Sequence, residues 1–379
     1  MTRNEVNELA LSTIDRAKFL ILELTTGFGK SKLAINLINH ICDRVFKNSK
    51  ESTSVLILVA KRVHKQTWLD EFNKWGGINT DNVKIECYES FKKYKNSYFD
   101  TVIMDELQHL SDARKEILET IHINEAFIGL SATIKRDMRD YFIHKYNAEV
   151  IKCGLKEAIE DNVLPEPMVY TIPLELDNRK YTYKIKKFGR TITTTQRGYY
   201  NDLSSLIDWY KNKYYNSRNI RVKNLWLSTA GRRLKWLSEQ KEAFIIHLLD
   251  KFKNYKTLTF CSSIEQTERL GKYNITSKNR KSTEYLNMFN YDKIKHITAC
   301  AILNEGVNLN NCRIGIFCNL NSSEIISRQR VGRILRHKSP IVILPYFKNT
   351  REEQLVNKMI EEYPEDRVKT CYNINEIEL

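Results

Sequence analysis

Short runs of apolar residues alternate with longer helical stretches through the first half of the chain. This spacing is typical of parallel βα units, in which a helix follows each buried strand and covers the sheet. Strands are expected at residues 19–24, 55–60, 101–104 and 126–130. Polar residues follow each of these runs, and ligands bind at the carboxyl ends of the strands in open α/β sheets. The functional residues are therefore expected at those ends.

The pattern changes after the Leu-Pro-Glu-Pro sequence at residues 164–167. A basic and aromatic region comes first, with an expected hairpin of residues 180–187 and 191–196 and expected helices at 202–215 and 232–252. A second α/β set follows, with strands expected at 257–261, 295–299, 313–318 and 341–345. We therefore predict an α/β protein with two domains, residues 1–165 and 166–379, whose two parallel sheets in tandem make a cleft. The basic region is expected as an insertion or extension at the start of the second domain.

The composition is that of a soluble globular protein, with 42% apolar and 28% charged residues in a chain of 379. There is no apolar run of about 18 residues and no signal-like N-terminus, so we expect an intracellular, cytoplasmic protein without a membrane partner. The eight cysteines are scattered without a Cys-x-x-Cys pair, and we interpret them as reduced thiols rather than zinc ligands or disulfides. No structural metal is expected, no obligate protein partner is evident, and we expect a monomer.

Positive charge is concentrated in one part of the chain. The formal net charge is +15, and residues 178–250 contain 16 Lys or Arg against 5 Asp or Glu. This excess predicts a polyanionic partner. Aromatic residues are interleaved with the cations and could stack on bases or ribose, although the alternative is a small aromatic core beneath a solvated basic surface. The abundance of Asn, Lys, Ile and Tyr indicates an A/T-rich genome, such as that of a phage, a mobile element or a low-GC bacterium.

Residues 25–31, Thr-Thr-Gly-Phe-Gly-Lys-Ser, lie between an apolar run and a helical stretch. In such a loop, successive backbone N–H groups and the N-terminus of the next helix converge on a phosphate. Gly27 and Gly29 permit the tight turn, Lys30 would neutralise the β- and γ-phosphates of ATP, and Ser31 would hold Mg²⁺. The alternative is a strand-to-helix turn that merely contains Gly-Lys-Ser, because Leu24 stands where the full pattern has its first glycine.

Two adjacent carboxylates end the expected strand at 101–104. Asp105 as a metal ligand and Glu106 as the group that orients and deprotonates water would suit a Mg²⁺-bound nucleotide. The next strand runs into Ser131-Ala132-Thr133, a sequence that is uninformative alone because small hydroxyl residues often cap turns and helices.

The segment Gln-Arg-Val-Gly-Arg-Ile-Leu-Arg, at residues 329–336, carries three arginines at helical spacing. Guanidinium groups delivered across a cleft stabilise charge on a γ-phosphate, an effect worth roughly 10³- to 10⁵-fold in rate. The alternative is a basic helix face that binds a phosphate backbone or solvent. Gly332 inside the segment costs helix stability, which indicates a close approach.

In this order and spacing, Thr-Gly-Phe-Gly-Lys-Ser, Asp-Glu-Leu-Gln, Ser-Ala-Thr and Gln-Arg-Val-Gly-Arg-Ile-Leu-Arg resemble motifs I, II, III and VI of the superfamily 2 helicases. The sequence is most similar to the branch of type III restriction subunits, XPB-like helicases and phage branch-migration helicases. Residues 57–61 followed by Trp68 resemble motif Ia, and residues 87–91 resemble the short motif after it. Residues 258–262 and 303–309 resemble motifs IV and V.

The resemblance implies two RecA-like domains with ATP and Mg²⁺ in the cleft and nucleic acid across both. The implied nucleotide-binding residues are Thr26, Gly27, Phe28, Gly29, Lys30, Ser31, Asp105 and Gly306, with Ser31 and Asp105 on the metal. The implied catalytic residues are Glu106, Gln329, Arg333 and Arg336. Gln108, Ser131 and Thr133 would couple the nucleotide to the nucleic-acid track. The expected nucleic-acid contacts are Lys61, Ser90 and Cys300 from the motifs, and Lys186, Lys187, Arg190, Arg232 and Arg233 from the basic region.

Some positions depart from the family pattern. Gln108 stands where His or Asp is usual, Asn308 replaces the motif V Asp, and Cys300 replaces a backbone-binding Thr. The residues before the phosphate loop lack an evident glutamine motif for adenine, so base selectivity is expected to be loose. No hydrolytic group is lost, and we expect an active enzyme.

These features lead to the hypothesis of an ATP-dependent DNA helicase or translocase. Compactness and composition suggest phage replication or recombination, and a host-encoded role in repair or defence is the alternative. An RNA helicase is the alternative, because one sequence does not expose a contact to the 2′-OH. An alternative of another class is a nucleic-acid clamp or annealing module that uses ATP only as a conformational switch.

Overall fold

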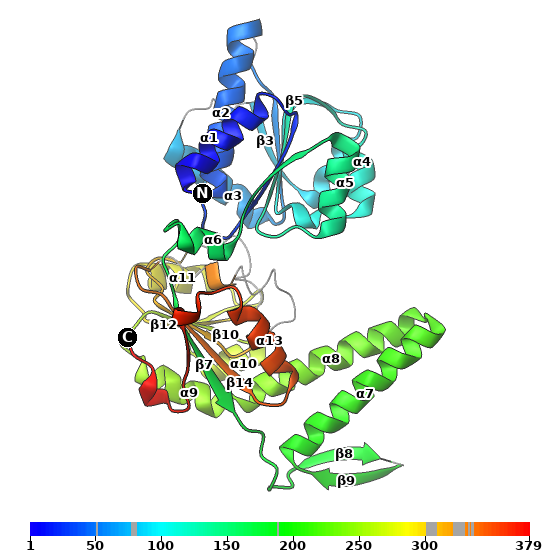
Figure 1. Cartoon of the computed structure of the whole chain (residues 1–379), viewed down its shortest axis with the longest axis vertical. Helices are drawn as coiled ribbons and strands as arrows, with labels where there is room; N and C mark the ends of the chain where they lie inside the picture. Colours follow the sequence, from blue (N-terminus) through cyan, green and yellow to red (C-terminus); the bar gives the residue numbers. More distant parts are fainter. Residues whose placement is uncertain are drawn as a thin grey trace. The chain divides into compact units, whose positions relative to one another are not determined.

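The computed structural model describes residues 1–50, 52–76, 82–187, 189–300, 309–320, 330–332, 334 and 337–379. The chain divides into two compact units, Met1–Pro165 and Glu166–Leu379. Figure 1 shows that each unit has its own sheet.

Unit 1 is built on a parallel sheet of six strands in the order β3-β2-β4-β5-β1-β6. The strands are β1 (Phe19–Leu24), β2 (Val55–Val59), β3 (Val83–Cys87), β4 (Tyr98–Asp105), β5 (His122–Ser131) and β6 (Glu149–Cys153). The four strands predicted from apolar runs, β1, β2, β4 and β5, are confirmed. They occupy the interior of the sheet, and β3 and β6, which were not predicted, are its edges.

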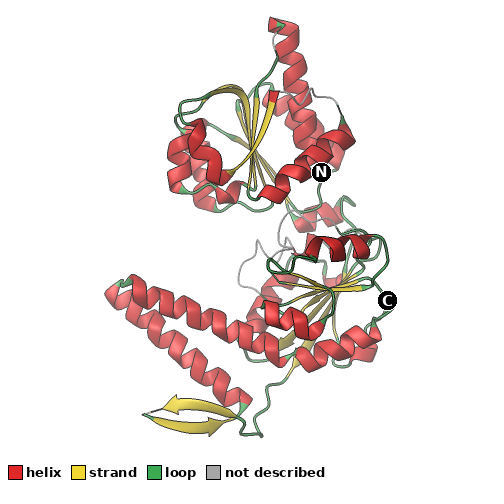
Figure 2. Ribbon diagram, turned by 180° about the vertical axis from the view of Figure 1, so that it is seen from behind, coloured by secondary structure: helices red, strands yellow, loops and turns green. Residues whose placement is uncertain are grey.

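Helices cover both faces of this sheet (Figures 1 and 2), with α1, α2 and α3 on one face and α4 and α5 on the other. Their bounds are α1 (Arg3–Ile14), α2 (Lys30–Ser49), α3 (Arg62–Trp75), α4 (Asp112–Leu118), α5 (Arg136–Tyr146) and α6 (Leu155–Glu160), with short 3₁₀ turns at Tyr88–Tyr94 and Leu107–His109. On the α4–α5 face, Phe127 of β5 stacks on Phe142 of α5 at 5.1 Å between ring centroids. This aromatic layer belongs to a core that continues into the turn after β4 through Leu107.

Unit 2 contains a parallel sheet of seven strands in the order β11-β12-β10-β13-β14-β7-β15. The strands are β7 (Met168–Leu174), β10 (Thr257–Phe260), β11 (Asn274–Ile275), β12 (His296–Ala299), β13 (Ile314–Phe317), β14 (Ile341–Phe347) and β15 (Val368–Thr370). The helices packed around it are α9 (Glu242–Lys251), α10 (Ile264–Leu270), α11 (Ser282–Asn290) and α13 (Arg351–Ile360), with 3₁₀ turns at Glu365–Arg367 and Ile374–Glu376. The four strands predicted in this half are confirmed as β10, β12, β13 and β14.

The basic region is an excursion between β7 and α9 (Figure 1). It consists of an antiparallel hairpin, β8 (Tyr183–Lys187) with β9 (Arg190–Thr194), and two long antiparallel helices, α7 (Gln196–Ser217) and α8 (Ile220–Gln240). We call these two helices the prong. The predicted hairpin is confirmed, but the single helix predicted over 232–252 is wrong.

That predicted helix is broken at Lys241, between α8 and α9. Lys241 is fully buried and its ammonium binds the carbonyl of Pro345 and the carboxylate of Glu352. The side chain fixes the junction so that α9 turns onto the sheet and buries Ile245 and Leu248. The apolar periodicity continues through the junction, so it does not reveal the break.

A small cluster holds the base of the prong on unit 2. Leu176, Tyr200, Trp236 and Leu237 pack against Phe347, the last residue of β14. The rings of Tyr183, Tyr199 and Trp236 lie within 5.6 Å of one another. At the base, therefore, the aromatic residues form a core, as the alternative interpretation of the sequence proposed.

Candidate functional site

Four interior strands of unit 1 run parallel, so their carboxyl ends meet at one edge of the sheet. The loop 25–31 follows β1, Lys61 follows β2, Asp105 ends β4 and Ser131 ends β5. The structure therefore places the residues predicted from four separate motifs along the same edge, as expected for a ligand site in an open α/β sheet.

The loop after β1 has the backbone of a phosphate cradle. Gly27 and Gly29 have φ angles of 91° and 102°, a region that L side chains rarely adopt. Phe28, between them, is buried and donates its backbone N–H to the Thr25 carbonyl at 3.3 Å. Helix α2 begins at Lys30, so the N–H groups of its first turn face the loop. The half-buried Ser31 is the second residue of that helix.

Two cations lie against this loop. Lys30 Nζ donates to the carbonyl of Leu24 at 2.9 Å, back along its own loop. Arg3, at the start of α1, donates from Nε to the Phe28 carbonyl at 3.0 Å and from Nη2 to the Gly27 carbonyl at 3.3 Å. Arg3 was missed from the sequence, because nothing in the local pattern links the first helix to this loop.

Asp105 is the most electrostatically perturbed carboxylate at this edge. Trp68 of α3 donates its indole N–H to Asp105 Oδ2 at 3.0 Å, and Tyr88 donates its hydroxyl to the Asp105 carbonyl at 3.1 Å. Burial raises the pKa of Asp105 to about 6, the neighbouring Glu106 adds to the rise, and Trp68 and Lys30 oppose it. The carboxyl group of the half-buried Asp105 is thus partly desolvated, and a cation there would favour its ionised form.

Glu106 is connected to the end of the neighbouring strand by hydrogen bonds. Its backbone is left-handed, with φ 54° and ψ 59°, which is uncommon for a non-glycine residue and costs about 1–2 kcal/mol. Gln108 Nε2 donates to Glu106 Oε2 at 2.6 Å, and Ser131 Oγ lies 2.6 Å from Gln108 Oε1. Ser131 Oγ also accepts from the backbone N–H of Thr133 at 3.2 Å. Gln108, Ser131 and Thr133 therefore form one network with Glu106.

A buried carboxylate that was missed from the sequence joins β1 to the segment just after Thr133. Glu23 of β1 forms an ion pair with Arg139 of α5 and accepts from the Ile134 N–H at 3.4 Å. Glu23 is 5% exposed, and a buried carboxylate must be paired to be tolerated. The strand that enters the phosphate loop is thereby held to the segment just after Ser131–Thr133.

The donors at this edge fit Mg²⁺ with a nucleoside triphosphate. A left-handed glycine turn at a helix N-terminus, with a lysine beside it, is a phosphate site. A serine hydroxyl and a desolvated carboxylate are the oxygen ligands that Mg²⁺ prefers. Of the residues that would hold ATP and Mg²⁺, Thr26–Ser31 and Asp105 all belong to unit 1. Among the described residues, no group of three or more His, Cys, Asp or Glu side chains is placed to hold a metal ion by itself.

The expected contribution of unit 2 to this site lies outside the described residues, because Gly306, Gln329, Arg333 and Arg336 are not among them. Arg330, next to these arginines, is buried, donates to the Asn319 carbonyl at 2.9 Å and lies 5.1 Å from the ring of Phe260. Burial lowers the pKa of Arg330 to about 10. Arg330 is part of the packing of unit 2.

The predicted nucleic-acid residues fall into two groups. Lys61 is exposed, and Ser90 and Cys300 are half-buried, each just beyond a strand. In the basic region, Lys186, Arg190 and Arg232 are exposed, and Lys187 pairs with Arg190 in the hairpin register. Arg233 instead lies between the helices of the prong, where it donates to Ser204 Oγ at 2.8 Å.

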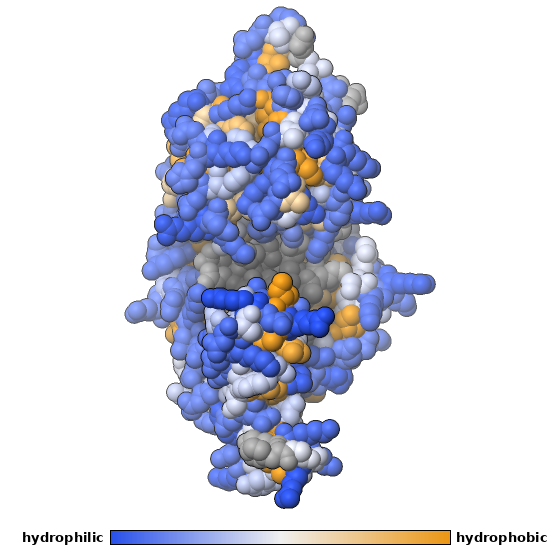
Figure 3. Space-filling view, turned by 90° about the vertical axis from the view of Figure 1, so that its right-hand side faces the viewer, coloured by the Kyte–Doolittle hydropathy of each residue, from blue (hydrophilic) through white to orange (hydrophobic). Residues whose placement is uncertain are grey.

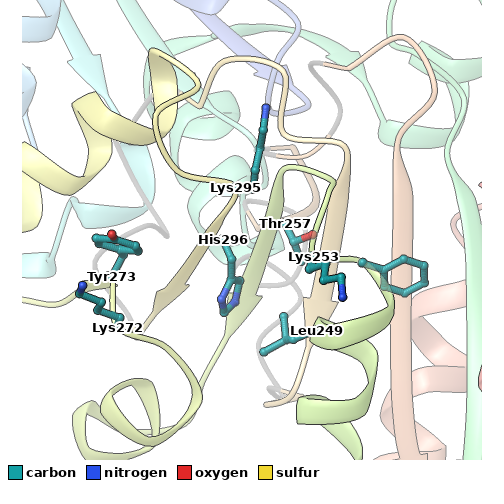
Figure 4. A pocket seen from close by; sticks show the side chains of 8 residues that line it. Leu249, Lys253, Thr257, Lys272, Tyr273, Lys295 and His296 are labelled. Carbon is teal, nitrogen blue, oxygen red and sulfur yellow. The ribbon is translucent and has the colours of Figure 1, made fainter.

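A pocket that the sequence did not predict lies at the amino ends of β10 and β12 (Figure 4). Lys253, Lys272, Lys295 and Tyr273 line it, together with His296. Burial lowers the pKa of His296 to about 4, and the ring lies 3.2 Å from Thr259 Oγ1. Strands of one parallel sheet share their direction, so this pocket is at the opposite edge from Cys300.

Comparisons with known proteins agree with this geometry. The helicase conserved C-terminal domain family matches residues 240–338. The DNA 3′-5′ translocase XPB2 of Sulfurisphaera tokodaii is 22% identical over 368 residues, a match that covers 86% of this chain and 76% of that protein. Both matches agree with the motif order of a superfamily 2 helicase. The resemblance identified from the motifs is confirmed, and this helicase is an enzyme that hydrolyses ATP and acts on nucleic acid.

Solved structures support the fold of this helicase. A fragment assigned to the HsdR subunit of a type I restriction enzyme from Vibrio vulnificus YJ016 has a TM-score of 0.63 at 17% identity, covering 98% of this chain and 68% of that one. The Hef helicase domain of Pyrococcus furiosus has a TM-score of 0.52 at 12% identity, covering 93% and 97%. The predicted tandem RecA-like domains are confirmed.

Three further expectations concern the origin of the chain, membrane-spanning helices and the cysteines. None of the relatives supports the phage origin inferred from composition. Within the described ranges, no helix of this helicase is long and apolar enough to cross a membrane. All eight cysteines are free thiols, six of them buried.

Proposed function

We propose that the protein is an ATP-dependent DNA translocase or helicase. The observation that carries the proposal is the network of Glu106, Gln108 and Ser131 beside the phosphate loop. It connects the proposed hydrolytic carboxylate to the end of the next strand through two short hydrogen bonds. A change in the position of Glu106 would therefore be transmitted to Ser131, and a movement of Ser131 would likewise be transmitted to Glu106.

The proposed roles in unit 1 follow from these contacts. Lys30 would exchange the Leu24 carbonyl for phosphate oxygens, and Ser31 and Asp105 would hold Mg²⁺, which supplies charge neutralisation when bound. Glu106 would orient and deprotonate the attacking water, since Gln108 holds its carboxylate by one oxygen. Arg3 would keep the Gly27 and Phe28 carbonyls turned away from the phosphates, because its guanidinium binds both.

Unit 2 would complete the hydrolytic site with Gln329, Arg333 and Arg336, and Gly306 would contact the nucleotide, as the family motifs imply. Arginines supplied from the second unit would make hydrolysis depend on closure of the two units. At roughly 10³- to 10⁵-fold in rate, such an effect is large enough to prevent wasteful turnover.

DNA is the proposed track, because the matched relative is named a DNA translocase. Lys61, Ser90 and Cys300 would contact its backbone, and the basic excursion of unit 2 would extend the surface. The excess of 16 cations over 5 anions in residues 178–250 supports a polyanionic partner of some length.

Steady-state ATP hydrolysis tests the proposal, measured without nucleic acid and with single-stranded DNA, duplex DNA, forked DNA and RNA at two salt concentrations. We expect strong stimulation by DNA that weakens with salt. Glu106→Gln should lower kcat at least 100-fold and leave ATP binding intact, whereas Glu116→Gln, an exposed glutamate of α4, should have no effect.

The alternatives give different results. Stimulation by RNA alone would identify an RNA helicase. ATP binding without turnover in any condition, or turnover unaffected by Glu106→Gln, would contradict the proposed hydrolytic site and favour a nucleotide-dependent clamp.

A further inference from the structure

The two helices of the prong pack through a regular seam. Positions 200, 203, 207, 210 and 214 of α7 and 222, 226, 229, 233 and 236 of α8 alternate in steps of three and four, the spacing of one helix face. The buried residues of both helices include Tyr200, Leu203 and Ile207 on α7 and Val222, Thr229 and Trp236 on α8. Tyr214 and Trp226 extend the seam outward, with ring centroids 6.2 Å apart.

Several large apolar side chains of the prong do not belong to this seam. They lie in its outer half, residues 209–227, which we call the prong tip. Their exposed fractions are 53% for Trp209, 50% for Tyr215, 71% for Ile220, 47% for Leu225 and 52% for Leu227. Exposed apolar side chains of this size, gathered in the outer half of one helical hairpin, indicate an interaction surface rather than a packing requirement.

The charge around these side chains has one sign. The prong tip, residues 209–227, contains five Lys or Arg and no Asp or Glu. Lys213 Nζ lies 4.7 Å from the ring centroid of Trp209, and the guanidinium of Arg218 lies 5.6 Å from that of Tyr215. Figure 3 views the molecule from the side toward which the prong points in Figure 1, and shows hydrophobic patches next to strongly hydrophilic ones.

A partner for this surface must offer negative charge and flat apolar faces together. Duplex DNA offers phosphates, but its base faces are covered by neighbouring base pairs. Unpaired nucleotides offer both, since phosphates bind Lys and Arg while exposed bases stack on aromatic rings. We propose that the prong tip binds unpaired nucleotides, stacking bases on Trp209 and Tyr215 while Lys213 and Arg218 hold the adjacent phosphates.

This inference deepens the proposed function, from which it takes nucleic acid as the partner, and names the form of nucleic acid that unit 2 recognises. A continuous single strand and the unpaired arm of a fork share this chemistry. The geometry of the tip requires only that a few bases be unstacked.

Fluorescence anisotropy with labelled oligonucleotides of equal length tests the inference, using single-stranded, forked and blunt duplex DNA without ATP. Trp209→Ala and Tyr215→Ala should each weaken binding of single-stranded or forked DNA about 5- to 100-fold, the range for loss of one stacked base. Binding of the blunt duplex should change less than about twofold. Tyr291→Ala is the matched control, because Tyr291 is 76% exposed and lies in unit 2 outside the prong.

Tryptophan fluorescence provides a second readout. Stacking of bases on Trp209 should quench the tryptophan fluorescence of the wild-type protein. The Trp209→Phe variant should lose most of this quenching while its affinity for single-stranded DNA stays within about threefold of wild type. Far-ultraviolet circular dichroism of each variant checks that α7 and α8 are folded.

Three results would overturn the inference. Equal weakening for single strand and duplex would mean that the tip acts by charge alone. If the variants are folded and bind every oligonucleotide as tightly as the wild-type protein does, the surface would be assigned to another partner, such as an acidic protein. Greater weakening of the duplex than of the single strand would reverse the recognised form. ATPase stimulation by DNA would still test the proposed function separately, since it does not require the tip.

Discussion

The ion pair of Lys241 and Glu352 allows a quantitative test of how the prong is held on unit 2. The ammonium and carboxylate are 2.7 Å apart, and both side chains are 0% exposed. The remaining bonds run to the backbone, from Lys241 Nζ to the Pro345 carbonyl at 3.0 Å and from the Phe347 N–H to Glu352 Oε2 at 3.2 Å. Burial raises the pKa of Glu352 against the opposing effect of Lys241.

Glu352→Gln removes one charge and leaves the ammonium buried without its counter-ion. Breaking a buried pair in this way costs about 3–5 kcal/mol of unfolding free energy. With a urea dependence of about 1–3 kcal/mol per M, the unfolding midpoint of unit 2 should fall by at least about 1 M. In contrast, Lys241→Met with Glu352→Leu removes both charges together and should recover most of the loss, because the desolvation penalty disappears as well.

The assay is hydrogen exchange of peptides from α8 and α9 across a urea series, read by mass spectrometry, since this reports unit 2 alone. The matched control is Glu175→Gln, which breaks an ion pair to Lys348 of similar length, 2.9 Å, at the surface, with side chains 66% and 39% exposed. It should cost less than about 1 kcal/mol. If Glu352→Gln costs no more than this control, or if the double variant is no better than the single one, the reasoning about this pair is refuted.

Three further predictions concern single positions. Gln108→Ala should lower DNA-stimulated kcat about 10- to 100-fold, since it removes a hydrogen bond to an ionised carboxylate. Gln66→Ala, which breaks an exposed hydrogen bond to Asp70, should leave kcat unchanged. Equal kcat values for the two variants would contradict the proposed network. Gly29→Ala should destabilise unit 1 by about 1–2 kcal/mol and weaken ATP binding, because Gly29 has φ 102°, although a Cβ there would meet no atom within 4 Å. Gly231 lies in the interior of α8, where a Cβ also meets no atom within 4 Å. Gly231→Ala should therefore stabilise unit 2 by about 0.5–1 kcal/mol in thermal or urea unfolding. The pKa of His296 is about 4 in the folded state against 6.5 in the unfolded state, so between these pH values the unfolded state binds more protons. The free energy of unfolding should therefore fall by about 2 kcal/mol from pH 7 to pH 5. A His296→Gln variant that keeps this pH dependence would show that another group causes it.

Interior strands were predictable because they are apolar on both faces. β1, β2, β4 and β5 of unit 1 are paired on both sides and nearly fully buried, so each appears as a continuous apolar run. The edge strand β3, Val-Lys-Ile-Glu-Cys, carries polar residues at alternate positions, β6, Glu-Val-Ile-Lys-Cys, has only two adjacent apolar residues between polar ones, and β15 has only three residues. Their patterns are too short or too mixed to be distinguished from loops.

The candidate site was predictable to the extent that its residues lie in short local motifs. The phosphate loop, Asp105–Glu106 and Ser131–Thr133 are such motifs. The side chains that hold them in place are distant in sequence, such as Trp68 on Asp105 and Arg139 on Glu23. Only the packing of α3 and α5 against the sheet brings these side chains to the edge, and no spacing rule in one sequence encodes that packing.

The excursion that carries the prong leaves the sheet after β7 and returns at α9, and its two ends are neighbours, since Leu176 and Leu237 belong to the same small cluster. The match to the helicase C-terminal family begins at residue 240, where α8 ends. The excursion therefore leaves and re-enters unit 2 at neighbouring points, before the part of the chain that matches the helicase family. Such an arrangement would allow the prong to be replaced by a different insertion while the units that bind and hydrolyse ATP stay the same. Replacement of residues 178–238 by a short turn should yield a protein that still folds and hydrolyses ATP. Its preference among single-stranded, forked and duplex nucleic acid should differ from that of the wild-type protein.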